Sequence, residues 1–464
     1  MTLGGCSVGP NYRRPDVSVP AVWNEEHGSI KTAPADLARW WTAFDDPLLN
    51  SLIERAARSN VDLRLAEARI REARALRGVT AADAWPAVNV SGSYARRRTS
   101  KNALSLPQGQ GLPASSFGDL DRDLFTSGFD ASWEIDLFGG VRRAVEAADA
   151  RIEASIEDRR HVLVTLLGDV AKNYIDLRGL QRRLAVARAN LKTQQETLEL
   201  TRVRFAAGLA SDLDVAQAES QVKTTEAQIP TLESSLKQAA HRLSVLVAQE
   251  PGALWSELST EAPIPALPPE VLVGLPSELL RRRPDIRRAE RQLAAATAEI
   301  GVATADLFPK FSLTGTAGLQ SISASDWFTG RSRFWSVGPT ISWPVFDAGR
   351  IRANIEVRNA RQEQALALYE KTILTALEDV ENALGNYSRE QARYRSLLEA
   401  VAADRRAVQL ANELYIRGLN DFLNVLDAQR SLLSSESELA QSEAAMAANL
   451  VALYKALGGG WETP

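Results

Sequence analysis

The sequence predicts a mainly α-helical membrane protein with a small β portion, of mixed α/β class, built from two halves that repeat one another. Three observations predict this fold class: an internal twofold sequence repeat, two very long helical segments, and four segments of alternating polar and apolar residues. The repeat is clearest where Asn60–Pro86 returns as Arg283–Pro309, and it continues where Ser132–Leu209 returns as Ser342–Leu419. A duplication of this length indicates one structural unit used twice.

The two long segments, Val141–Phe205 and Ile351–Tyr415, contain no proline. At about 1.5 Å per residue, each makes a helix of roughly 100 Å. Apolar residues recur in them at spacings of three and four, and charged residues occupy much of the remaining surface. Each helix therefore buries one stripe against its neighbours. An ordinary coiled coil and the wall of a helical tunnel both fit this pattern.

Each long helix is predicted to turn back on itself. Gly208 and Gly418 follow the two helices, and glycine suits the left-handed position after a helix C-terminus. Asp212 and Asp421 come next, where a carboxylate caps or complements the following helix N-terminus. The resulting helical hairpins are expected over residues 139–248 and 349–457.

Four segments alternate between apolar and polar residues and are predicted to be β-strands. About ten residues per tilted strand match the thickness of a bilayer, and aromatic residues lie near the strand ends. A half-buried soluble sheet would alternate in the same way. Four strands cannot close a barrel, however, and open edges cannot lie in lipid, so several chains must contribute. The predicted strands are 87–98, 125–136, 310–320 and 333–345.

Composition and motifs argue against an enzyme. The formal charge of −4 offers no basic field for nucleic acid. The histidines have no metal-ligand spacing, and no phosphate-binding loop of the G-x-x-x-x-G-K type occurs. We therefore expect no catalytic, metal or cofactor site, and we expect Gly458–Gly460 to be a flexible tail. No run of about 18 apolar residues predicts a transmembrane helix.

Two segments resemble a known family. Cys6–Pro15 is similar to the start of lipoprotein outer-membrane factors, and Leu275–Ile286, with its Arg-Arg-Arg-Pro-Asp run, is similar to their most recognisable internal segment. Trp40–Trp41 and Asp46–Leu48 continue the match, which covers essentially the whole chain. The sequence thus resembles TolC-like outer-membrane factors (outer-membrane efflux proteins), in the lipoprotein branch of the NodT/OprM type associated with resistance-nodulation-division efflux systems. Only five residues precede Cys6, so we expect a trimmed leader or a start that lies upstream.

The resemblance implies a homotrimer with a 12-stranded transmembrane barrel, four strands from each protomer, continuous with an α-helical barrel in the periplasm and with an equatorial collar. It implies a lipid anchor on Cys6, with palmitate among the acyl chains, in the outer membrane of a Gram-negative bacterium. The expected regions are a lipid-anchor and equatorial segment (1–59), a first repeat (60–250), an equatorial linker (251–282), a second repeat (283–457) and a tail (458–464).

The function implied is that of a passive exit duct in a tripartite efflux system, which carries drugs or other toxic small molecules out of the cell. Its partners would be a periplasmic adaptor protein, an inner-membrane resistance-nodulation-division pump and outer-membrane lipid, with no nucleic acid. A duct for a type I protein-secretion system is the alternative within export. A soluble coiled-coil scaffold is the alternative from another class.

Three groups of residues are candidates for function. By resemblance, Asp427 occupies the family's gating position, with Leu423 one turn earlier and Arg430 placed for an ion pair with Asp427; a routine surface pair is the other interpretation. The hairpin ends, Gly208-Leu209 and Gly418-Leu419, would dock the adaptor, although ordinary turn chemistry also explains them. Arg96–Arg98 is expected to be a solvated loop, with anionic lipid headgroups or lipopolysaccharide as the alternative partner.

Overall fold

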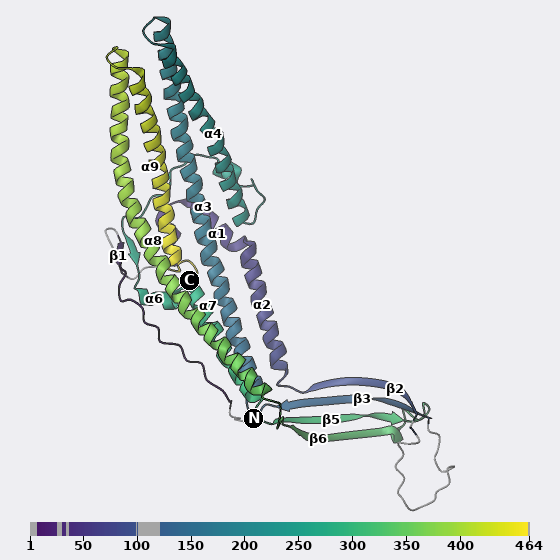
Figure 1. Ribbon diagram of the computed structural model, residues 1–464. Coiled ribbons are helices and arrows are strands. Elements are labelled where there is room, and N and C mark those ends of the chain that lie inside the picture. The colour runs from purple at the N-terminus through teal and green to yellow at the C-terminus, as the bar shows by residue number, and fades with distance from the viewer. Residues whose placement is uncertain (1–6, 26–29, 34–36, 99, 101–120, 463–464) are drawn as a thin grey trace, which may run out of the picture. The chain divides into compact units, whose positions relative to one another are not determined.

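A computed structural model describes residues 7–25, 30–33, 37–98, 100 and 121–462. The chain is mainly helical with a small β portion, as predicted (Figure 1). It forms two compact units, one from residues 1–15, 71–153 and 290–367, and the other from 16–70, 154–289 and 368–464. Each unit takes residues from both halves of the sequence. No helix in the described part of the chain has both the length and the apolar character needed to cross a bilayer.

The first unit contains a four-stranded antiparallel sheet in the order β2-β3-β5-β6. All four predicted strands are present, and two of their ends differ from the prediction by more than one residue. The strand β3 starts before residue 125, because Asp121 pairs with Arg98 across the hairpin. The strand β6 ends before residue 345, because Pro344 has no N–H to donate to a sheet. The strands are β2 (Ala87–Arg98), β3 (Asp121–Ile135), β5 (Lys310–Ser321) and β6 (Arg333–Ser342).

The two faces of this sheet differ in chemistry, and both are largely exposed in the single chain. We call one the apolar face, because its exposed side chains are large and hydrophobic. The other, polar face carries mainly Ser, Thr, Asn and Gly, and on it Ser91 Oγ donates to Asp130 Oδ2 at 3.1 Å. The expectation that Arg96–Arg98 form a loop was wrong, because these residues extend β2 and alternate between its faces. The apolar face includes Val88, Val90, Tyr94, Phe129, Trp335, Val337 and Ile341.

The N-terminal segment of the first unit is held beside the start of the helix α3 (Gly140–Ala206). Val8 N donates to Phe138 O at 3.1 Å. The Arg143 side chain is only 5% exposed and reaches three residues of this segment: its Nε donates to Val8 O, and its Nη2 donates to Gly9 O and to Asn11 Oδ1 at 2.7 Å. We call residues 7–15 the N-terminal strap.

The second unit contains both predicted hairpins. One joins α3 to α4 (Asp212–Leu246), and the other joins α8 (Arg350–Ile416) to α9 (Phe422–Ala456). The long helices both contain 67 residues and the returning helices both contain 35. The two helices of each hairpin run side by side in opposite directions (Figure 1).

Glycine ends both long helices as predicted, and both aspartates lie at the N-termini of the returning helices as predicted, although neither is the residue whose side chain caps a helix. The φ angles of Gly208 and Gly418 are +73° and +72°. Ser211, rather than Asp212, is the N-cap of α4, and it forms a reciprocal capping box with Asp214. Asp421 is the N-cap of α9, yet its side chain makes no capping hydrogen bond.

The second unit also contains several short elements. β1 (Ile30–Thr32) pairs in parallel with β4 (Val271–Val273). Asp46 caps α1 (Pro47–Ser59) by accepting from Leu48 N and Leu49 N, and it also accepts from Tyr174 OH at 2.7 Å. The remaining elements are the 3-10 helix η1 (Trp40–Phe44), α5 (Trp255–Leu258), α6 (Pro276–Arg282) and the start of α7 (Pro284–Ala305). The helix α2 (Val61–Ala82) begins in this unit.

The expectation of a flexible glycine tail was wrong. Gly458, Gly459 and Gly460 are all buried. A Cβ on Gly460 would lie 2.6 Å from Leu167, so the tail fits there only without side chains. Trp461 then donates from Nε1 to Arg282 O at 2.9 Å and lies beneath the Arg160 and Arg287 guanidinium groups, at 4.5 and 5.2 Å from the ring centroid. These contacts hold residues 458–461 in place.

Candidate functional site

The predicted gate residues lie near the start of α9. Leu423 is 52% exposed and Asp427 is also exposed, and their spacing of four places them on one face of the helix. The neighbouring Phe422, Val425 and Leu426 are buried. Packing of the apolar stripe therefore turns Leu423 and Asp427 outward from the protomer.

A shared hydrophobic core joins the ends of the two hairpins. It contains residues from all four helices, so the hairpins are packed against each other at this level. Tyr415 lies 5.5 Å from Phe422 and 4.6 Å beneath the Arg204 guanidinium, measured to ring centroids. Arg204 Nη1 also donates to Ile416 O at 3.0 Å. The core residues are Leu198, Ala218, Val222, Ala411, Tyr415, Phe422, Val425 and Leu426.

The expected ion pair between Asp427 and Arg430 is absent from the described residues. Arg430 Nε instead donates to Gln221 Oε1 at 2.8 Å, a bond that links α9 to α4. Beside it, Gln429 Nε2 donates to Thr197 Oγ1 at 2.8 Å and links α9 to α3. These two hydrogen bonds between the hairpins were not predicted from the sequence. Their signal was the polar residues Gln221 and Gln429 at positions where the helical period expects apolar ones, and both are buried.

The tips of the hairpins present apolar side chains to their surroundings. Leu209 is 66% exposed and Leu419 is 70% exposed. Gly208 and Gly418 have open space around them, because a Cβ built on either would meet no atom within 4 Å. Glycine is therefore required at these turns by its positive φ and not by crowding.

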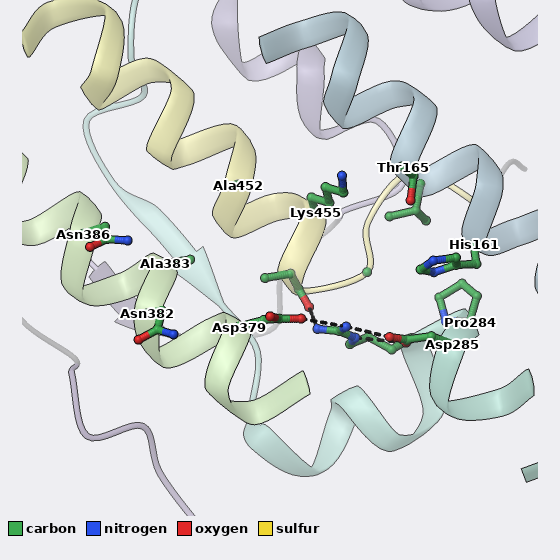
Figure 2. A pocket seen from close by; sticks show the side chains of 14 residues that line it. His161, Thr165, Pro284, Asp285, Asp379, Asn382, Ala383, Asn386, Ala452 and Lys455 are labelled. Atoms are coloured by element: carbon green, nitrogen blue, oxygen red, sulfur yellow. Dashed lines mark hydrogen bonds and ion pairs between the residues drawn. The ribbon is translucent and has the colours of Figure 1, made fainter. Parts of the chain in front are cut away.

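A pocket of about 350 Å³ lies in the second unit between α3, α7, α8 and α9 (Figure 2). His161 and Thr165 border it from α3, and Lys455 borders it from α9. Burial, partly offset by the Asp285 carboxylate, lowers the pKa of His161 below its usual value. The pocket is lined by His161, Val164, Thr165, Arg283, Pro284, Asp285, Asp379, Asn382, Ala383, Asn386, Ala452, Lys455, Ala456 and Gly458. The described residues contain no group of three His, Cys, Asp or Glu side chains suited to a metal ion.

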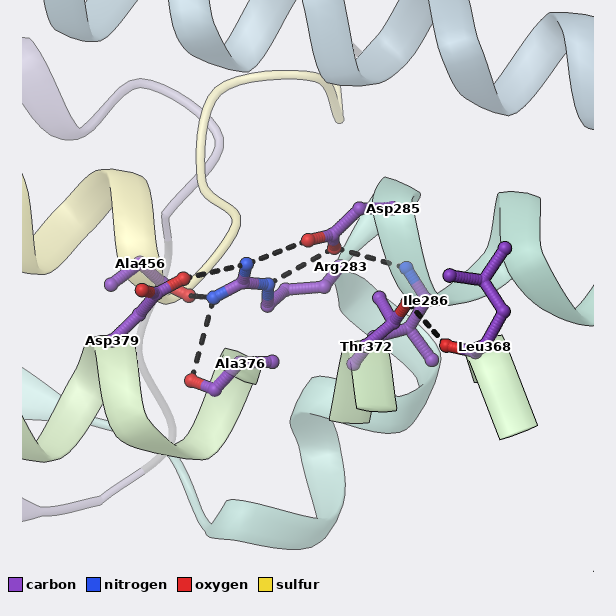
Figure 3. Close-up of polar contacts among 8 residues, drawn as sticks. All are labelled: Arg283, Asp285, Ile286, Leu368, Thr372, Ala376, Asp379 and Ala456. Carbon is purple, nitrogen blue, oxygen red and sulfur yellow. Dashed lines mark hydrogen bonds and ion pairs between the residues drawn. The ribbon is translucent and has the colours of Figure 1, made fainter. Parts of the chain in front are cut away.

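Arg283, one of the residues that line this pocket, is at the centre of a group of polar contacts (Figure 3). Its Nε and Nη2 donate to the two carboxylate oxygens of Asp285 at 3.0 and 2.6 Å, and Nη2 also donates to Asp379 at 3.0 Å. Its Nη1 donates to Ala456 O, the last residue of α9, at 3.0 Å and to Ala376 O at 3.4 Å. One side chain thereby ties together α7, α8 and the end of α9.

The positive charge of Arg283 determines the protonation state of Asp285, its main partner. Burial alone would raise the pKa of the Asp285 carboxyl group. The hydrogen bonds and positive charge of Arg283 outweigh burial, and they hold the pKa of Asp285 below its usual value. Asp285 is therefore ionised in the folded chain and fully paired.

Cys6, the predicted lipidation site, lies outside the described residues. The described chain next to it is the N-terminal strap, which Arg143 holds in the same compact unit as the four-stranded sheet.

Comparisons with known proteins identify the family. The profile of the family described as "Outer membrane efflux protein" matches residues 52–249 and 275–459. Nodulation protein T of Rhizobium leguminosarum bv. trifolii is 35% identical over 99% of this chain and 96% of its own length. The pyoverdine export outer membrane protein OpmQ of Pseudomonas aeruginosa is 35% identical over 100% of this chain and 96% of its own length. The solved structure of the outer-membrane channel OprN is similar with a TM-score of 0.90 and 40% identity, covering 99% of this chain and 100% of that one. The chain belongs to the outer membrane efflux protein family.

Proposed function

We propose that this chain is the outer-membrane exit duct of a tripartite efflux system and conducts small molecules passively. The observation that carries this proposal is the four-stranded sheet, whose apolar face is exposed and whose edge strands, β2 and β6, are each paired on one side only among the described strands. Large exposed apolar faces indicate contact with another chain or with lipid. A sheet with open edges cannot enter a bilayer alone, because every backbone group must be hydrogen-bonded there.

Three copies would join β6 of one protomer to β2 of the next and give a closed barrel of twelve strands. The number three comes from the family resemblance. The twofold repeat, supported by the equal helix lengths of the two halves, would give such a ring six similar sectors. Cys6 would carry the lipid anchor. The inner-membrane pump would supply the energy for transport, and the periplasmic adaptor would dock onto the duct.

Size-exclusion chromatography of the detergent-extracted protein, combined with light scattering, tests this assembly. We expect a particle of three chains that conducts ions in planar bilayers. A monomer that stays soluble without detergent would overturn the duct and would favour the scaffold alternative, for which family membership gives no support.

We further propose that Leu423, Asp427 and Arg430 form the periplasmic gate. In a trimer the outward-facing Leu423 and Asp427 would form an apolar ring and an acidic ring around the pore. The bond from Arg430 to Gln221 would hold the second hairpin against the first in the closed state.

Two substitutions test the gate separately. Asp427→Ala should raise single-channel conductance by relieving the acidic ring, and Gln221→Leu should raise the open probability, because it removes the link from α4 to Arg430. The matched control is Glu219→Gln, an exposed position two residues away on α4. Conductance and open probability that stay at the level of the parent in both variants would remove these residues from the gate.

The hairpin tips are proposed as the adaptor-docking surface, with Leu209 and Leu419 as apolar contacts beside Gly208 and Gly418. Leu209→Asp and Leu419→Asp should reduce cross-linking to the adaptor about tenfold, because a buried charge at an interface is strongly unfavourable. Both side chains are exposed, so the thermal unfolding midpoint should not change. Normal cross-linking and export in the double variant would leave the tips as ordinary turns.

A further inference from the structure

We propose that Arg97 of β2 and Arg122 of β3 form an oxyanion-binding site on the polar face of the sheet, one site in each protomer. The ligand class is a solute that carries phosphate or carboxylate groups. The site itself lies within one chain, and only its placement at the outer mouth of a pore rests on the proposed function.

The first step is the assignment of faces. Tyr94 OH donates to Asp123 Oδ1 at 2.9 Å, so Tyr94 and Asp123 share the apolar face. Ser91 and Asp130 are joined by a hydrogen bond on the opposite face. Because side chains alternate along a strand, Arg97 lies on the face of Ser91, and Arg122 lies on the face of Asp130. Both arginines are therefore on the polar face, and both are exposed.

The second step is the register. Arg97 and Arg122 are directly opposite each other in the antiparallel pairing of β2 with β3. The Cβ atoms of such a pair are about 5 Å apart, and like charges on directly opposite residues destabilise the pairing. This pair therefore costs stability unless an anion lies between the two guanidinium groups.

The third step is a comparison with the adjacent arginines. Arg96 and Arg98 point to the apolar face, where each has a carboxylate partner: Arg96 Nε lies 4.0 Å from Asp123, and Arg98 Nη1 lies 3.4 Å from Asp121. Within the described parts of the chain, neither Arg97 nor Arg122 has an ion pair or a hydrogen bond through its side chain. Among the described residues, the four arginines thus divide into two with carboxylate partners on one face and two without such partners on the other.

The fourth step is the chemistry of the pair. A guanidinium group presents a planar set of donors that matches phosphate and carboxylate oxygens. Two of them from neighbouring strands can hold one oxyanion from two sides. On β3, the acidic residues of the polar face, Asp130 and Glu134, lie toward the opposite end of the strand, nearer the helices. Asp326, in the loop after β5, lies near Leu124 at the same end of the sheet as the two arginines but forms no ion pair with either of them among the described residues.

In the proposed duct, this end of the strands opens to the exterior, so the site would meet anionic solutes as they leave. Along β3, the polar face carries Asp130 and Glu134 toward the helices and Arg122 at the outlet. Attraction would act locally, because the Debye length at physiological ionic strength is about 8 Å. Each pair would then bind a passing anion separately.

Titration calorimetry of the detergent-solubilised full chain with inositol hexaphosphate tests the site at low salt. We expect binding to the parent protein, and we expect it to weaken by about tenfold or more in Arg97→Gln/Arg122→Gln, because charge-assisted hydrogen bonds are lost. The matched control is Arg96→Gln/Arg98→Gln, which changes the same charge at the same level on the other face and should bind within about twofold of the parent. Binding should also fall as salt is raised.

Stability and conductance give two independent readings. Arg122→Gln alone should leave the unfolding midpoint unchanged or raise it, because one of two like charges is removed. In planar bilayers, inositol hexaphosphate added on the exterior side should reduce the current of the parent and not that of the double variant. Equal weakening in both double variants would mean that binding depends on total charge and not on this pair, and would overturn the site, as would unchanged binding in Arg97→Gln/Arg122→Gln. Binding lost as expected in a protein that never conducts would contradict the duct and leave the site standing.

Discussion

Replacement of Arg283 by methionine is expected to lower the free energy of unfolding by about 3–5 kcal/mol, which is the usual cost of removing one partner from a buried ion pair. Arg283 is 8% exposed and donates to two carboxylates and to the carbonyl groups of Ala456 and Ala376. Without it, Asp285 remains buried and charged, and the end of α9 loses its connection to α7. Chemical denaturation of the detergent-solubilised protein at pH 7 measures the change.

The pH dependence of this variant provides an internal check. In the parent, the lowered pKa of Asp285 stabilises the fold above the unfolded pKa of the carboxyl group, and this contribution is lost as pH falls through the folded pKa. In Arg283→Met, burial raises the pKa of Asp285, so protonation at low pH relieves the buried charge. The stability deficit should therefore shrink as pH falls toward about 4.

The control for Arg283 is its neighbour in the same motif. Arg281 is exposed, and Arg281→Met should change stability by less than about 0.5 kcal/mol. Equal losses in the two variants, or a deficit in Arg283→Met that grows as pH falls, would contradict the assignment of Arg283 as the residue that holds α7, α8 and α9 together.

Replacement of Arg143 by methionine is expected to release the N-terminal strap and to cost about 2–3 kcal/mol, because several charge-assisted hydrogen bonds are removed together. Trypsin cleavage between Arg13 and Arg14 should become about tenfold faster or more, because local opening becomes easier by more than about 1.4 kcal/mol. Arg77→Met is the control, since the ion-pair partner of Arg77 within the described residues is the exposed Asp149. Cleavage at the parent rate in Arg143→Met would mean that contacts other than Arg143 hold the strap.

The secondary structure was predictable from the sequence because it follows from local periodicity. The alternation that predicts β2 and the proline-free helical period that predicts α3 both depend on residues that are close together in the sequence. Details at the ends of elements have equally local causes: Pro344 has no N–H with which to extend β6, and the Ser211 side chain caps α4 because it accepts from Asp214 N.

The partners of polar side chains were not predictable in this way. Arg430 is three residues from Asp427 in sequence, yet it bonds to Gln221, because packing of the two hairpins brings α4 beside α9. The glycine tail was misjudged for a similar reason, since only the folded unit shows that Trp40, Trp41 and Leu167 enclose Gly460. The roles proposed for Leu423, Asp427, Gly208 and Cys6 remain predictions that rest on the family resemblance.

The open edges of the sheet have a consequence for heredity. In the proposed ring each chain supplies one strand edge to the copy before it and another to the copy after it, so each seam depends on two different molecules. Consider a cell that makes equal amounts of intact chains and of chains whose β6 edge cannot pair with a neighbouring strand. If chains mix at random in the trimer, only about one ring in eight would consist of intact chains alone. Such an allele would be dominant over the wild type, although the altered chain by itself builds nothing.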